Sequence, residues 1–505
     1  MVITQLPLPS GGAHPTRGSS VRGGCSRSAS EKSRWLPFRY VQGDGLCAWR
    51  PHEDRLPVPT RHVTEPSGLN RQILRLAVPA LGALLAEPTF LLVDAAIVGH
   101  LGTEQLAGVG IASVILGTLV GLSVFLAYGT TAQVARSLGA GQPDRALTFG
   151  IAGLYLAVII GLVLLVIGFP LAPQLIGWFG GGPAESEYGT IFLRWSLIGL
   201  PAMLSVLATT GVLRGLQDTR TPLLVAVIGA FVNVALNLLL VNGLRLGVAG
   251  SAIGTVITQT GMAVALIAVV VRAARRHGAA LAPHTGHIRG AGRAGIPLFI
   301  RTLTLRLAII VTTVVAARQG VVALAAQQVV LSIWNFLALG LDALAIAAQA
   351  LTGKALGEGN GPAARALTKA MLRWGVLAGA IIGAGVLLIH AVAGAAFSPD
   401  PAVRAAVAAG LIVVALSQPI SGWVFVLDGV LIGAGDGVYL AGAGVITLVA
   451  YLPAAAAVAI WAPGGAAGLV WLWVAFSVVF MGARAITLGL RYRGDKWLVT
   501  GAISS

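Results

Sequence analysis

Long apolar stretches, separated by short polar breaks, follow one another along most of the chain. From residue 69 onward the stretches reach about 20 residues or more, the length that an α-helix needs to cross the hydrocarbon core of a bilayer. The breaks contain Gly, Pro and Arg, as expected of loops between spans. We therefore predict an all-α integral membrane protein with twelve transmembrane helices, at 72–98, 105–137, 147–169, 189–214, 222–242, 249–271, 294–317, 321–353, 367–390, 403–433, 437–460 and 466–490.

The second half of this pattern repeats the first at a constant offset of 218 residues. Shared apolar composition would give scattered matches, whereas these matches keep one offset from end to end. The sequence therefore predicts one six-helix membrane unit used twice. The matched pairs include Pro79 with Pro297, Gly102 with Gly320, Gly141 with Gly359, Pro201 with Pro419, and the segments 211–218 with 429–436.

Six helices per copy is an even number, so both copies enter the membrane in the same orientation. The two lobes are then related by a pseudo-two-fold axis along the membrane normal, as in transporters built from parallel repeats. We assign residues 69–271 to the N-lobe, 294–490 to the C-lobe, 272–293 to a cytoplasmic connector and 491–505 to a cytoplasmic tail. Two facing bundles of this kind are typical of a carrier that rocks around a central site.

Composition supports the membrane assignment and excludes other classes. Hydrophobic residues make up 56% of the chain and charged residues 10%, against about 25% charged in soluble domains. The net charge of +16 comes from a terminal tail and short loops, so we expect no nucleic-acid partner. The only cysteines are Cys25 and Cys47, which indicates neither a disulfide framework nor a metal site. We expect no cofactor.

The first 68 residues differ from the rest. They are rich in Arg, Ser, Gly and Pro, and no apolar run precedes Leu74. A secretory signal needs an apolar region of about 7–15 residues, so this segment is not predicted to be one. Its polar, basic composition predicts a disordered N-terminal extension. A start codon assigned too far upstream explains the segment equally well.

Loop charges predict the orientation. Basic residues are enriched in cytoplasmic loops, and here they follow every second span except the tenth. Both termini are therefore predicted to be cytoplasmic, in the plasma membrane of a bacterium. The basic residues on this side include Arg136, Arg145, Arg214, Arg220, Arg272, Arg275, Arg276, Lys354, Arg365, Lys369, Arg491 and Arg493.

Two acids in the first span are candidates for ion coupling. Glu87 and Asp94 are seven residues apart, which places them on one helix face about 10 Å apart along the axis. Pro88 removes a backbone donor between them and predicts a kink. A bendable helix carrying two acids suits a proton- or sodium-driven gate, whereas the structural alternative is that Asp94 only pairs with a neighbour near the outer end.

The C-lobe spans carry Arg301, Arg306, Asp342 and Asp428. A charge in the bilayer core costs about 2.5–3.5 kcal/mol on insertion scales, so such residues usually neutralise one another. A purely structural network is one interpretation. In the functional one, an aspartate exchanges its arginine partner for a proton or substrate during the cycle.

Neutral polar and aromatic residues add weaker candidates. Asn233 and Asn237 lie one turn apart on the fifth span and either line a polar cavity or hydrogen-bond a neighbouring helix. Ring faces attract organic cations, although core packing is the commoner role of such residues. The candidate substrate aromatics are Trp334, Phe336, Trp423 and Phe425.

The stretches "VDAAIVGHLG" (93–102), "GVLRGLQDTRTP" (211–222), "LDALAIAAQALTGKALG" (341–357) and "FVLDGVLIGAGD" (425–436) resemble the multidrug and toxic compound extrusion (MATE) family, in particular its DNA-damage-inducible-F (DinF) branch. The similarity covers about residues 70–490. It implies a two-lobed, twelve-helix secondary antiporter that exports cationic or amphipathic compounds against inward H⁺ or Na⁺.

By the same resemblance, Asp94 is the first-span acid whose protonation is linked to helix bending, and Asp428 matches an acid associated with cation coupling in another branch. Asn233 matches an asparagine near the N-lobe cation site. Asn237 occupies a position that is Asp in some members, so a sodium site there lacks its second carboxylate and protons are favoured. Glu87 is a conjectural substitute acid.

Three functions compete. The leading one is a monomeric antiporter for small organic cations or amphipaths, driven by protons. A flippase for lipid-linked or amphipathic substrates keeps the fold but needs a cationic cavity for phosphates, and the mixed mid-membrane charges weigh against it. An intramembrane enzyme would need an aspartate cluster, a Ser/His or paired-Asp arrangement, or an HExxH motif within the spans, and none is visible.

Overall fold

The computed structural model describes residues 38–43, 46–51, 66–180, 182–282 and 285–501. The chain divides into two units, Met1–Thr64 and Glu65–Ser505. In the first unit, strands β1 (Phe38–Gly43) and β2 (Leu46–Pro51) form an antiparallel pair, which the sequence analysis did not anticipate. The rest of the predicted extension, up to the start of the first helix, lies outside the described residues.

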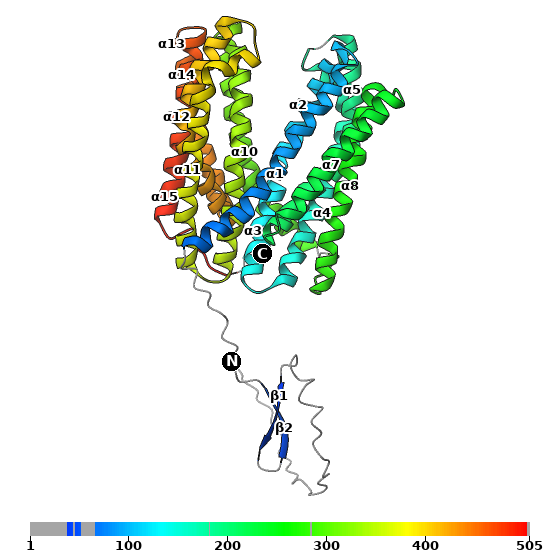
Figure 1. Ribbon diagram of the computed structural model, residues 1–505, viewed down its shortest axis with the longest axis vertical. Helices are drawn as coiled ribbons and strands as arrows, with labels where there is room; N and C mark the ends of the chain where they lie inside the picture. The colour runs from blue at the N-terminus through cyan, green and yellow to red at the C-terminus, as the bar shows by residue number, and fades with distance from the viewer. Residues whose placement is uncertain (1–37, 44–45, 52–65, 181, 283–284, 502–505) are drawn as a thin grey trace, which may run out of the picture. The chain divides into compact units, whose positions relative to one another are not determined.

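The second unit is helical (Figure 1). Eleven of its helices, taken over the described residues, are long and apolar enough to cross a membrane, and the pair α5–α6, bent by 50°, supplies a twelfth span. The prediction of a twelve-helix membrane fold is thereby confirmed. The helices are α1 Pro66–Gly99, α2 Thr103–Leu122, α3 Phe125–Gly139, α4 Pro143–Gly177, α5 Pro183–Ile198, α6 Leu200–Gly215, α7 Arg220–Asn237, α8 Gly247–Arg276, α9 Thr285–Arg318, α10 Val321–Gly357, α11 Gly361–Ala393, α12 Pro401–Gly433, α13 Gly437–Trp461, α14 Ala466–Val474 and α15 Met481–Arg493.

Short irregular turns of helix complete several spans. A π-helix, η3 (Leu238–Gly243), extends α7, and another, η5 (Ala475–Phe480), joins α14 to α15. A 3₁₀ turn, η4 (Gly394–Ala396), ends α11. Helices α2 and α3 together form one span, from Thr103 to Gly139.

The turns between helices reproduce the sequence repeat in backbone geometry. Gly141 and Gly359, which are repeat mates, end α3 and α10 with φ of 72° and 77°. Only glycine adopts this left-handed region without a steric penalty from Cβ, which explains why both turns carry it. The mates Gly247 and Gly465 likewise have φ of 56° and 73°. Glycines with positive φ that recur at the offset of 218 residues support the twofold use of a single unit.

The helices form two bundles with separate cores (Figure 1). One apolar cluster joins α2, α4, α5 and α6, and another joins α10 through α15. Large apolar side chains such as Phe231, Leu388 and Ile460 remain exposed, as expected where the surrounding solvent is lipid.

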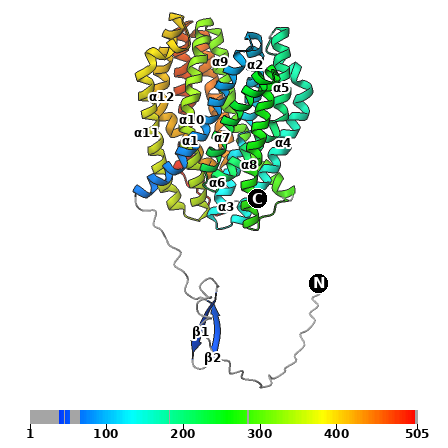
Figure 2. The same ribbon diagram turned by 45° about the vertical axis from the view of Figure 1, so that its right-hand side comes forward.

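Helix α1 connects the two bundles. Ile73 and Leu76 in its first half belong to the C-lobe core, and Ala80 packs with Ala343 and Ile346 of α10. Its second half packs along α7 of the N-lobe, and Figure 2 shows it running diagonally between the bundles. The first half of α1 thus lies on the C-lobe, although we assigned all of it to the N-lobe. Its repeat mate α9 contacts α3 and α4 as well as α13.

The bundles approach most closely where α3 and α10 end. A Cβ atom on Gly139 would lie 2.1 Å from the Lys354 carbonyl oxygen, and one on Gly357 would lie 2.1 Å from the Arg136 carbonyl oxygen. The two glycines are repeat mates, as are Arg136 and Lys354, so this contact is itself pseudo-symmetric. The lobes are therefore sealed together at the end of the unit that carries the basic loops.

Candidate functional site

The first candidate cluster surrounds Asp94 in the second half of α1. Asp94 is 5% exposed, and its Oδ1 accepts hydrogen bonds from Asn237 Nδ2 at 2.6 Å and from Ser251 Oγ at 2.7 Å. Asn237 Nδ2 also donates to Asn233 Oδ1 at 3.1 Å, and Asn233 Nδ2 donates to Thr255 Oγ1 at 3.2 Å. Among the described residues, no hydrogen bond reaches Asp94 Oδ2.

Three helices hold this cluster in place. Asn233 and Asn237 share a face of α7 because they are one turn apart, as the sequence predicted. The π-helix η3 begins directly after Asn237; π-helical turns are frequent at functional sites. Ser251 and Thr255, which the sequence analysis missed, are also one turn apart on α8. Their spacing beside the glycines of α8 was a detectable signal of a polar stripe.

Polar groups in the cluster are not all satisfied. Asn237 Oδ1 is buried and has no hydrogen-bond partner, although it lies so close to Gly254 that a Cβ there would be 2.6 Å away. An unpaired buried acceptor costs free energy, so the hydrogen bonds that Asn237 donates are offset in part by this unsatisfied oxygen. The Glu87 side chain lies outside the described residues, and Pro88 is inside α1.

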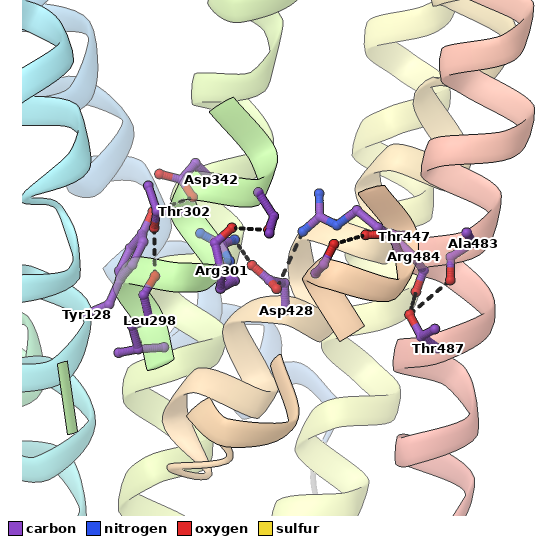
Figure 3. Close-up of polar contacts among 12 residues, drawn as sticks. Tyr128, Leu298, Arg301, Thr302, Asp342, Asp428, Thr447, Ala483, Arg484 and Thr487 are labelled. Atoms are coloured by element: carbon purple, nitrogen blue, oxygen red, sulfur yellow. Dashed lines mark hydrogen bonds and ion pairs between the residues drawn. The ribbon is translucent and has the colours of Figure 1, made fainter. Parts of the chain in front are cut away.

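The second cluster is centred on Asp428 in α12, as Figure 3 shows. Asp428 forms one ion pair with Arg301 of α9 and another, at 3.4 Å, with Arg484 of α15. All three side chains are largely buried, with exposures of 6%, 12% and 9%. One carboxylate thus faces two guanidinium groups. The sequence analysis missed Arg484, although a single charge in an otherwise apolar span was a detectable signal.

Asp342 of α10 lies next to this cluster, at the junction of the lobes. Tyr128 of α3 donates a hydrogen bond to Asp342 Oδ1 at 3.5 Å, and the Arg301 guanidinium lies 5.6 Å from the centre of the Tyr128 ring. Arg214 of α6 also interacts electrostatically with Asp342. We had placed Arg214 in a loop, but it lies in the last turn of α6 and reaches the other lobe. Tyr128 and Arg214 thus bring N-lobe groups to a C-lobe network.

Two small cavities adjoin Asp428. One, of about 10 Å³, is lined by residues that include Arg301, Thr447 and Arg484, and a second of about 10 Å³ is lined by Tyr128 and Asp342 among others. A volume of this size holds about one water molecule. Hydrated contact between the two acids is therefore sterically possible.

The remaining candidates lie apart from both clusters. Arg306 is exposed and has no ion pair among the described residues, in contrast to the neutralising pair we expected. Its guanidinium reaches α2 of the opposite lobe, where a Cβ on Gly121 would be 2.4 Å away. Trp334, Trp423 and Phe425 pack against the C-lobe core, whereas Phe336 is 58% exposed.

A family model described as MatE matches residues 79–239 and again residues 297–457. The second match lies at the same offset from the first as the sequence repeat, and together they cover more than half of the chain.

Two curated relatives extend the match along the chain. Protein DETOXIFICATION 45, chloroplastic, of Arabidopsis thaliana is 29% identical over 462 residues, which cover 86% of this chain and 80% of the relative. DNA damage-inducible protein F of Escherichia coli (strain K12) is 27% identical over 370 residues, which cover 72% of this chain and 81% of that protein.

The fold has solved counterparts. The bent form of the Vibrio cholerae MATE transporter VcmN matches with a TM-score of 0.77 at 21% identity, covering 86% of this chain and 97% of that one. The predicted two-lobed transporter fold is therefore confirmed.

Proposed function

We propose that this chain, which belongs to the MatE family of membrane transporters, exports amphipathic organic compounds in exchange for inward-moving protons. The family consists of transporters, so the chain is a transporter and not an enzyme. The observation that carries the proposal is the buried Asp94 carboxylate, held by two donors on one oxygen and by none on the other among the described residues.

In this proposal Asp94 Oδ2 is the proton acceptor. Asn237 Nδ2 and Ser251 Oγ donate to Oδ1, and this oxygen remains a hydrogen-bond acceptor when a proton is bound to Oδ2. The cluster therefore accommodates both protonation states of Asp94.

Protons fit this cluster better than sodium. A sodium site is built from several oxygen atoms aimed at the ion, whereas here Asn237 and Ser251 aim hydrogen atoms at Asp94. Asn237 also supplies no second carboxylate. Donors around one carboxylate favour a site that titrates over a site that coordinates a metal cation.

Helix α1 is the element that would transmit protonation to the lobes. Its first half is packed on α10 and its second half, which carries Asp94, on α7. Pro88 separates the halves. A change in the hydrogen bonds that connect Asp94 to α7 and α8 therefore changes how α1 connects the two lobes. An inward charge moving through 100 mV supplies about 2.3 kcal/mol for the cycle.

The basic-loop end is the cytoplasmic end in this proposal, so the start of α1 and the end of α15 both face the cytoplasm of a bacterial cell. The close approach of Gly139 to the Lys354 backbone and of Gly357 to the Arg136 backbone then closes the cytoplasmic side of the seam between the lobes. We propose that the protein works as a monomer, because each lobe finds its partner within one chain.

Transport by the purified protein in proteoliposomes tests the function. The cargo is supplied as a panel of amphipathic dyes of either charge, ethidium included, and a pH gradient and a sodium gradient are imposed separately. We expect a dye flux that follows the pH gradient and is lost in Asp94→Asn but kept in the control Asp144→Asn, whose exposed acid lies at the basic-loop end. Flux that follows sodium, or that survives in Asp94→Asn, would contradict proton coupling through Asp94.

A further inference from the structure

We infer that the cargo of this transporter carries an anionic group, a carboxylate or a phosphate, which binds between the lobes beside Arg306. The inference rests on the proposed transport function and names the charge of its cargo. It differs from the organic cations that the family resemblance implied. Three observations support it: an excess of positive charge where the lobes meet, the exposure of the Arg306 side chain, and aromatic rings that already pack against other protein side chains.

Arginines outnumber acids where the lobes meet. In the network of Figure 3, Arg301 and Arg484 share Asp428. Asp342 interacts electrostatically with Arg301 and also with Arg214 of α6. Three guanidinium groups are thus balanced by two carboxylates among the described residues. The Arg301 Nε atom is buried and has no hydrogen-bond partner, so the network retains an unused donor as well as an excess of positive charge.

Arg306 adds a fourth guanidinium that is free to bind a ligand. It lies five residues after Arg301 on α9, it is exposed, and it has no hydrogen bond or ion pair among the described residues. Its guanidinium extends from the C-lobe to Gly121 in α2 of the N-lobe. An unpaired charge within a membrane span is costly in lipid and becomes favourable when it meets an anion. Arginine binds carboxylates and phosphates through paired N–H donors.

The aromatic residues give a cation little to bind. The face of Tyr128 is already occupied by Arg301. Trp334 meets Phe476 edge to face in the C-lobe, and Trp423 packs against the core near Gly489. Of the four aromatic residues that the sequence singled out, Phe336 alone is largely exposed, and one phenyl ring without an acid is a weak cation site.

An anionic group could come from a soluble organic acid or from the headgroup of a lipid. Both present the same oxygen atoms to Arg306, and they differ in whether an acyl chain remains in the bilayer. The first source matches an exporter of amphipathic acids. The second matches the flippase alternative, for which a cationic surface between the lobes is the required feature.

Two dyes with the same xanthene ring system and opposite charge test the inference: carboxyfluorescein, an anion, and rhodamine 123, a cation. In proteoliposomes with an imposed pH gradient, we expect uptake of carboxyfluorescein at least ten times faster than that of rhodamine 123. A third arm follows a fluorescently labelled phosphatidylglycerol by its protection from dithionite. Uptake of carboxyfluorescein without lipid movement identifies soluble anions as the cargo. Movement of the labelled lipid without dye uptake identifies a lipid with an anionic headgroup as the cargo.

Arg306→Gln should reduce the anionic flux at least tenfold without unfolding the protein, because Arg306 is exposed and unpaired. Arg318→Gln, an exposed arginine at the end of the same helix α9, is the matched control and should keep the flux. Faster uptake of rhodamine 123, or an unchanged flux in Arg306→Gln, overturns the inference while leaving proton coupling intact.

Equilibrium binding separates failure of the inference from failure of the proposed function. If no arm responds to the pH gradient, the proposed coupling is wrong, and fluorescence polarisation of each dye with the purified protein decides the charge of the ligand. Tighter binding of carboxyfluorescein that is weakened in Arg306→Gln supports the inference. Equal binding of the two dyes, or tighter binding of rhodamine 123, overturns it.

Discussion

The glycine pair at the basic-loop end offers a direct test of alternating access. In Gly357→Ala, the new Cβ would lie 2.1 Å from the Arg136 carbonyl oxygen and 2.9 Å from its carbonyl carbon. Both atoms belong to the backbone, so no side chain can rotate away. The ends of α3 and α10 must separate by about 1 Å to restore an ordinary contact, and overpacking of this kind costs about 1–3 kcal/mol.

That cost falls on the sealed conformation alone if the lobes part at this end during transport. A difference of about 1–3 kcal/mol then shifts the population toward the conformation open at the basic-loop end by about 5- to 150-fold. Spin labels at Asp144 and Pro362, two exposed repeat mates in the first turns of α4 and α11, report the change as a longer inter-label distance. Cys25 and Cys47 are first replaced by Ser.

Gly361→Ala is the matched control, because a Cβ there meets no atom within 4 Å. We expect its distance distribution to equal that of the parent protein. If Gly357→Ala lowers the thermal stability but leaves the inter-label distance unchanged, the seal is a permanent part of the fold. The lobes would then not part at this end, and the rocking interpretation would be wrong.

Much of the fold could be predicted from the sequence because its signals are repeated and strong. Span lengths are set by bilayer thickness. Where the boundary of a span is weak in one half of the chain, the equivalent position 218 residues away in the other half supports it. The offset pairs the turn glycines Gly141 and Gly359, and both have positive φ values in the structure. The Asn233 and Asn237 pair was likewise predicted from helical spacing.

Partnerships between helices could not be predicted in the same way. Ser251 contacts Asp94 of α1, and Arg484 contacts Asp428 of α12. No local sequence pattern indicates which helices will be neighbours. Arg214 looked like a loop residue because it ends a span, yet it interacts electrostatically with Asp342 of the other lobe. The packing of the first half of α1 on the C-lobe could not be predicted for the same reason.

Two further predictions concern buried arginines. In Arg136→Gln, the carbonyl groups of Ala434, Val499 and Gly501 lose their donor, so amide hydrogen exchange at 497–501 should accelerate at least tenfold. Lys354→Gln, which loses a 3.5 Å contact with Gln217 and a partly exposed ion pair with Glu358 but no contact with 497–501, should leave this exchange unchanged. In the Asp428 cluster, Asp428→Asn leaves two buried arginines uncompensated and should cost about 3–5 kcal/mol, whereas Arg484→Gln leaves the Arg301–Asp428 pair intact and should cost less. Because one acid serves two cations, adding Arg484→Gln to Asp428→Asn should restore part of the lost stability in thermal unfolding. Additive losses in the double variant would show that the two arginines do not compete for a single carboxylate.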